Sequence, residues 1–126
     1  MLEPSEELIR KLPKTDLHLH LDGSLRLPTL LELAREQGVA LPADSPEGLR
    51  ERVFKPSYRN LAEYLQGFAY TCAVLQDAEA LERVAYELAQ DNQAEGVRYI
   101  EVRFAPQLHV NAKLGLADVL GAVDKG

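Results

Sequence analysis

The chain has 126 residues, 46% hydrophobic and 27% charged, which is enough for one domain with a sizeable core. Its formal net charge of −6 argues against binding to a nucleic-acid backbone, and no apolar run approaches the roughly 20 residues of a membrane helix. With no apolar stretch typical of a secretory signal at the N-terminus and a single cysteine, which excludes an internal disulfide, we expect a cytoplasmic protein without nucleic-acid or membrane partners.

Start and stop signals divide the first half of the chain into short elements. A helix is predicted over residues 5–12, with Ser5 as its N-cap. Polar and apolar residues alternate over 15–21, which predicts a strand, and turn-forming residues follow at 22–24. Further helices are predicted between Pro28 and Gly38 and from Ser45 onward, because proline suits a first helical turn and glycine a helix end.

The second half of the chain adds two long helices and one strand. Helical periodicity predicts a helix over about 58–75 and another after Asp77, ending at Gly96. Residues 97–104 are rich in β-branched and aromatic side chains and are predicted as a strand, and a last helix is predicted over 114–123. The order strand, helices, strand, helix predicts an α/β fold with a parallel sheet. Two strands do not make a stable sheet, so we expect residues 1–126 to be a truncated N-terminal portion of one larger domain.

The sequence DLHLHLDG at residues 16–23 holds two of the three histidines of the chain. On a strand, residues two apart lie about 6.6–6.8 Å from each other on one face, so His18 and His20 share a face, and Asp16 and Asp22 share it with them. Imidazole nitrogens bind Zn²⁺ at about 2.0–2.1 Å, and two rings that lean together can reach one ion. The leucines between them, at positions 17, 19 and 21, are expected on the opposite face, against covering helices.

A strand with one solvated face would show the same alternation, so the spacing alone leaves both interpretations open. The position of the pair favours a site, because functional residues of α/β folds gather where strands end. A catalytic zinc site needs three protein ligands, and His109 is the only other histidine. It follows the second predicted strand. It could be a third ligand or an ordinary loop histidine, and the sequence leaves both interpretations open.

Residues 12–26, which read LPKTDLHLHLDGSLR, closely resemble the opening of the adenosine deaminase family of zinc-dependent TIM-barrel hydrolases. The similarity continues through EGVRYIEVRFAP at residues 95–106 and spans nearly the whole chain. The resemblance implies a (β/α)8 barrel. Since such a barrel takes about 250 residues, this chain would hold roughly its first two strands, with extra helices between them.

The resemblance also implies roles for individual residues. His18 and His20 would be ligands of Zn²⁺, His20 would border the substrate, and Asp22 would contact a sugar hydroxyl of a nucleoside. The proton donor and the base of the family lie on later strands, so no catalytic residue is expected within this chain. The helix from about residue 58 resembles a lid over the purine pocket. Its apolar stripe would form either pocket wall or plain core, and consists of Leu61, Tyr64, Leu65 and Phe68.

Glu101 and Arg103 share a face of the second predicted strand. We expect them to form an ion pair that supports a barrel, and not to take part directly in catalysis.

The function that the resemblance implies is hydrolysis of adenosine to inosine and ammonia by a zinc-dependent purine nucleoside deaminase, of which this chain carries part of the active site. One alternative is a deaminase of adenine or of a modified adenosine, although family members that act on free adenine tend to have Glu where this chain has Asp22. A second alternative is an inactive fragment that serves as a metal-binding or interaction module. Such a fragment would self-associate through exposed sheet edges.

Overall fold

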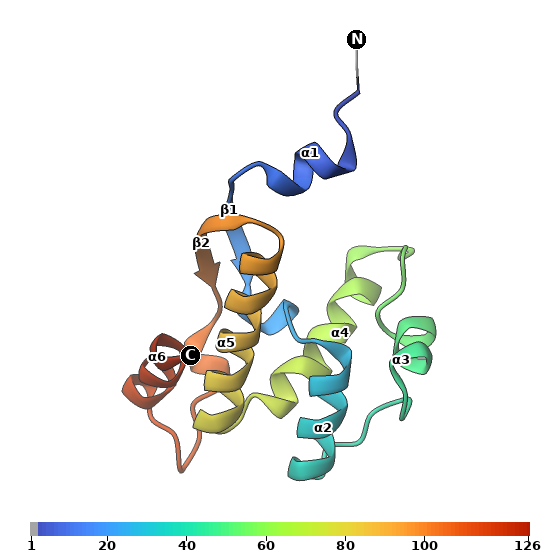
Figure 1. The fold of residues 1–126 in the computed structure, drawn as a ribbon. Helices are drawn as coiled ribbons and strands as arrows, with labels where there is room; N and C mark the ends of the chain where they lie inside the picture. Colours follow the sequence, from blue (N-terminus) through green and yellow to red (C-terminus); the bar gives the residue numbers. More distant parts are fainter. Residues whose placement is uncertain (1–2) are drawn as a thin grey trace.

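The computed structural model describes residues 3–126 and combines one small sheet with a layer of helices (Figure 1). Within these residues, no helix is long and apolar enough to cross a membrane. The elements in chain order are α1 (Glu6–Lys11), β1 (Lys14–His20), the 3-10 turn η1 (Leu21–Gly23), α2 (Leu27–Gln37), α3 (Pro46–Arg52), α4 (Leu61–Val74), α5 (Ala78–Ala94), β2 (Val97–Arg103), the 3-10 turn η2 (Pro106–Leu108) and α6 (Leu116–Lys125).

Side-chain caps fix where the helices begin. The side chains of Ser5, Ser45 and Asp77 each accept a hydrogen bond from a backbone amide in the first turn, as their positions in the sequence predict. The fourth helix starts later than residue 58, because the side chain of Asn60 accepts from the amide of Glu63 and caps it there. Helix α2 ends at Gly38, whose φ of 69° is left-handed and favours glycine.

Strands β1 and β2 pair in parallel, which confirms the predicted sheet and its α/β class. The ladder loses register twice. Lys14 pairs with Val97 and Thr15 already with Tyr99, which places one extra residue on β2. Farther along, Asp16 pairs with Ile100 and Leu19 with Val102, so β1 carries one extra residue there.

The core lies among the helices and not on the sheet. Leu21 of η1 joins it together with leucines and valines of α2 to α6, whereas no residue of either strand is buried. In Figure 1, α5 runs alongside the two strands with α6 against it, and α2 and α4 stand between the sheet and α3. The fully buried large side chains are Leu21, Leu30, Leu49, Val74, Leu75, Leu81, Val84, His109 and Val119.

A group of charged and polar side chains joins α2 to α5, and we call it the α2–α5 cluster. Thr29 donates to Glu87 at 2.6 Å, and both residues are buried. Arg83 bridges Glu87 at 3.0 Å and Glu32 at 2.6 Å. At the start of α2, Arg26 binds Asp91 at 2.6 Å. The cluster comprises Arg26, Thr29, Glu32, Arg83, Glu87 and Asp91.

The expectation that the leucines at positions 17, 19 and 21 all face covering helices is only partly correct. Leu21 is fully buried and Leu19 packs against the core, but Leu17 is 56% exposed. The extra residue of β1 falls between Asp16 and Leu19, so strict alternation of the two faces is interrupted at Leu17.

Candidate functional site

The two histidines of β1 lie side by side at the carboxyl end of the strand. The Nε2 atoms of His18 and His20 are 3.1 Å apart, and the ring centroids are 5.1 Å apart. The side chain of His20 is 49% exposed. At this distance the two rings can share a hydrogen bond, or they can bind one metal ion through both Nε2 atoms.

The spacing of these nitrogens fits one metal ion. Two nitrogens bound at 2.0–2.1 Å to a tetrahedral zinc ion lie about 3.3 Å from each other, close to the 3.1 Å observed. Catalytic zinc sites use three protein ligands. Among residues 3–126, no three His, Cys, Asp or Glu side chains gather into a metal-holding group. The residues that the structure describes therefore fit two ligands of such a site.

Asp22 follows the pair directly and is the buried carboxylate of the site. It lies in η1 and is 6% exposed, and its Oδ1 is 3.9 Å from Nδ1 of His20. Within residues 3–126, this Oδ1 is buried without a hydrogen-bond partner. A buried carboxylate oxygen is costly unless it accepts a hydrogen bond, so the position suits a ligand that brings a donor such as a hydroxyl.

The thiol of Cys72 lies on the other side of this carboxylate, with its Sγ 3.9 Å from Oδ2 of Asp22. Burial and, to a lesser degree, the charge of Asp22 raise the pKa of the thiol to about 11. Cys72 therefore stays protonated at neutral pH. It acts as a weak donor to Asp22 and not as a nucleophile.

A small cavity of about 110 Å³ opens beside Asp22. Of the predicted α4 stripe, Tyr64 and Phe68 line it, while Leu61 and Leu65 do not. Leu61, Tyr64 and Leu65 are 69%, 46% and 49% exposed, so these three residues of the stripe lie outside the core of the described residues. The lining residues are Asp22, Gly23, Phe54, Tyr58, Tyr64, Gly67, Phe68 and Thr71.

Aromatic side chains connect this cavity to the histidine pair. Phe68 meets the ring of His20 edge-on, with the centroids 6.3 Å apart, and Tyr64 meets Phe68 in the same way at 5.9 Å. Gly23 allows this approach, because a Cβ at its position would lie 3.3 Å from the Phe68 ring. Phe54 and Tyr58 also line the cavity, and sequence reasoning missed them because they come from the irregular segment between α3 and α4.

The alternative that His109 is a third ligand is not supported within residues 3–126, where it joins no metal-holding group. Its ring is fully buried, and its Nδ1 lies 2.9 Å from the carbonyl oxygen of Leu75. The ring of Phe104 lies beside it, with the centroids 5.9 Å apart. This histidine ties the turn after β2 to the end of α4.

The predicted ion pair between Glu101 and Arg103 is absent from the described residues 3–126. The carboxylate of Glu101 instead accepts from the hydroxyl of Tyr99 at 3.1 Å. Arg103 reaches across to β1 and donates to the backbone carbonyl of Leu17 at 3.3 Å.

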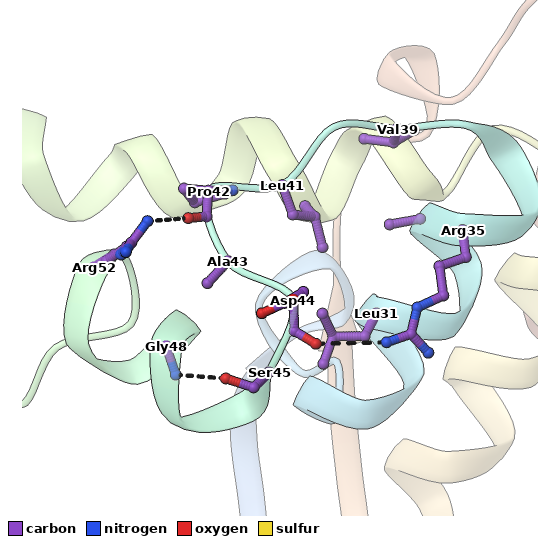
Figure 2. Close-up of a pocket in the computed structure, with 11 residues that line it drawn as sticks. Leu31, Arg35, Val39, Leu41, Pro42, Ala43, Asp44, Ser45, Gly48 and Arg52 are labelled. Carbon is purple, nitrogen blue, oxygen red and sulfur yellow. Dashed lines mark hydrogen bonds between the residues drawn. The ribbon is translucent and has the colours of Figure 1, made fainter.

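A larger cavity, about 530 Å³, lies elsewhere, between α2, the 39–45 loop and α3 (Figure 2). Arg52 donates to the carbonyl of Pro42 at 2.6 Å, and Arg35 donates to that of Asp44 at 3.4 Å. Both arginines thus brace the loop that forms the cavity. Neither histidine of the pair nor Asp22 lines this cavity, so it is separate from the histidine pair.

The model of a protein family described as adenosine deaminase matches residues 13–126. A probable adenosine deaminase of Dictyostelium discoideum is 46% identical over 131 aligned positions, which cover all of this chain and 17% of that protein. The adenosine deaminase of Shewanella halifaxensis is 46% identical over 92% of this chain and 35% of its own length. The chain thus spans about a third or less of these two relatives.

Solved structures agree with this similarity. An adenine deaminase from Arthrobacter aurescens superposes on 89% of this chain with a TM-score of 0.76 at 28% identity, over 33% of its own length. An amidohydrolase from Burkholderia ambifaria with bound zinc superposes on 98% of the chain with a TM-score of 0.75 at 25% identity, over 34% of its length.

Proposed function

The chain belongs to the adenosine deaminase family, and from this premise we propose that it supplies two zinc ligands and a sugar contact to the active site of a purine nucleoside deaminase. The reaction would convert adenosine and water to inosine and ammonia. The observation that supports the proposal most is the 3.1 Å approach of the two histidine nitrogens next to a buried carboxylate.

In this proposal, His18 and His20 hold the metal through their Nε2 atoms. Zinc, when bound, would supply Lewis-acid activation of a water molecule. The Nδ1 atom of His20 lies 3.9 Å from Oδ1 of Asp22, so Nε2 is the ring nitrogen of His20 that lies next to His18. Phe68 lies edge-on to the His20 ring, with the centroids 6.3 Å apart.

Asp22 would accept a hydrogen bond from a sugar hydroxyl of the nucleoside. Its Oδ1 is buried without a partner among residues 3–126, and Asp22 lines the cavity of about 110 Å³. This volume is below the roughly 300 Å³ of complete small-molecule pockets, so the described residues would hold only part of a nucleoside. The edges of Tyr64 and Phe68 would form an apolar wall for that part.

A chimera tests the proposal directly. Residues 13–126 would replace the aligned segment of the Shewanella halifaxensis adenosine deaminase, which is 46% identical. We expect the chimera to deaminate adenosine, as followed by the change in purine absorbance, and to lose this activity with His18→Ala or His20→Ala. We expect Asp22→Ala to reduce kcat/KM by about tenfold to 100-fold, since a hydrogen bond to a charged group is worth about 1.5–3 kcal/mol.

Glu79→Gln, on the exposed first turn of α5, serves as the matched control and should leave the activity of the chimera unchanged. Turnover of adenine or of a modified adenosine without turnover of adenosine would favour the alternative substrates. A folded chimera that binds no zinc and turns over no purine would contradict the proposed site. The chain by itself should deaminate nothing, because its residues 3–126 hold two of the three ligands that a catalytic site needs.

A further inference from the structure

The two strands lose register immediately before the histidine pair. Between Asp16 and Leu19, β1 takes three residue steps while β2 takes two, from Ile100 to Val102. Bulges are rare in parallel pairs, re-aim the side chains at the bulge, and are over-represented next to active sites. Here the bulge contains the peptide group that joins Leu17 to His18.

Both polar atoms of this peptide group are bound by side chains. Asp16 Oδ1 accepts a hydrogen bond from the backbone N–H of His18 at 3.1 Å. Arg103, on β2, donates from Nη2 to the carbonyl oxygen of Leu17 at 3.3 Å. One bond is local to β1 and the other crosses from β2, so together they fix the plane of this peptide from two directions.

We propose that Asp16 and Arg103 are positioning residues, which hold the Leu17–His18 peptide and thereby aim the ring of His18 at that of His20. The inference rests on the proposed metal site, since it concerns how one of its ligands is oriented. Rotation of this peptide would turn the Cα–Cβ bond of His18 and move its Nε2 out of the 3.1 Å approach. Functional constellations tolerate only about 0.5 Å of such displacement.

Zinc affinity of the full chain, measured by competition with a chromogenic chelator, is the first test. We expect Arg103→Ala and Asp16→Ala each to weaken zinc binding by about threefold to tenfold, less than the 10–100-fold of residues that touch a ligand side chain. Asp16→Asn keeps the accepting oxygen and should stay within about twofold of the parent chain. Arg98→Ala, an exposed arginine on the same strand, is the matched control and should also stay within about twofold.

Amide hydrogen exchange of the full chain, measured by NMR, tests the same proposal without metal. The His18 amide should exchange faster in Asp16→Ala, but not in Asp16→Asn or Arg98→Ala, while the amide of Leu81 in the core stays protected in all of them. Faster exchange at both His18 and Leu81 would indicate general destabilisation and overturn the positioning role.

The two failures can be told apart. If the parent chain binds zinc but Arg103→Ala and Asp16→Ala bind it equally well, the positioning role is wrong and the metal site stands. If the parent chain binds no zinc, its two histidines do not hold the metal without a third ligand. The chimera then tests the metal site, and the exchange of the His18 amide tests the positioning role.

Discussion

The helical region and the two-stranded sheet of this chain differ in what they bury. The helices enclose the core and the buried pair of Thr29 and Glu87, whereas no residue of β1 or β2 is buried. The histidine pair lies on the exposed sheet, and only Asp22 reaches into the buried region. This division implies that the histidine pair and the core lie on separate elements, so substitutions at the pair should leave stability unchanged and substitutions in the core should lower it.

The core of the helical region should give the largest change in stability. Leu81, fully buried in α5, should cost about 2–5 kcal/mol in the free energy of unfolding when replaced by alanine, because a cavity remains. Chemical denaturation measures this cost. Leu120→Ala on the exposed side of α6 is the control and should change stability by about 0.5 kcal/mol or less. Equal losses of stability in Leu81→Ala and Leu120→Ala would contradict the assignment of stability to the buried core.

The α2–α5 cluster should give the next largest effect. Thr29→Val removes the donor to the buried carboxylate of Glu87 while keeping the shape of the side chain. We expect a loss of about 2 kcal/mol, since hydrogen bonds to charged groups contribute about 1.5–3 kcal/mol. Thermal and denaturant unfolding measure it. Unchanged stability would show that the cost of burying the hydroxyl of Thr29 cancels the energy of its hydrogen bond to Glu87.

The cap of α4 should contribute less. Asn60→Ala leaves the amide of Glu63 without its side-chain acceptor and should cost about 1 kcal/mol, measured by denaturant unfolding. Gln66→Ala, at an exposed position within the same helix, is the control and should change stability by about 0.5 kcal/mol or less. If Asn60→Ala lowered the free energy of unfolding as much as Leu81→Ala, the start of α4 would have to belong to the core. That result would contradict the exposure of the first turn of α4.

The smallest effect should appear at acid pH. The backbone N–H of Arg59, followed by the side chains of Lys55 and Arg59, lowers the pKa of Glu63 from 4.5 to about 2. Because the folded-state pKa lies below the unfolded one, Glu63 stabilises the fold above about pH 4.5, and this contribution disappears as the pH falls toward 2. Unfolding temperatures of the parent chain and of Glu63→Gln should therefore converge between these pH values. A constant difference down to pH 2 would contradict the assigned cause.

Much of the fold could be predicted from the sequence because its signals are local. Ser5, Ser45 and Asp77 act as caps, Gly38 ends a helix, and the parallel pairing follows from the order of elements. The caps and the helix end depend on residues within a few positions of each other. The prediction that both histidines lie on one strand likewise depends only on the alternation of neighbouring residues.

The rest depends on partners that lie far apart in the sequence. The bulge in β1 reflects the register with β2, so the alternation of residues 15–21 could not reveal that Leu17 is exposed. Arg103 was expected to pair with Glu101 two positions away, but it finds a carbonyl on another strand. Phe54 lines the cavity from a segment without periodicity, for which no sequence signal was available.

Zinc binding and unfolding, measured together on the His18→Ala/His20→Ala double variant of the full chain, test most directly the separation of chemistry from stability. Both side chains belong to a strand without buried residues, so we predict a free energy of unfolding within about 0.5 kcal/mol of the parent chain and loss of the zinc binding that the parent shows. Zinc bound equally well by the double variant, or a chain unfolded by these two substitutions, would contradict the central claim.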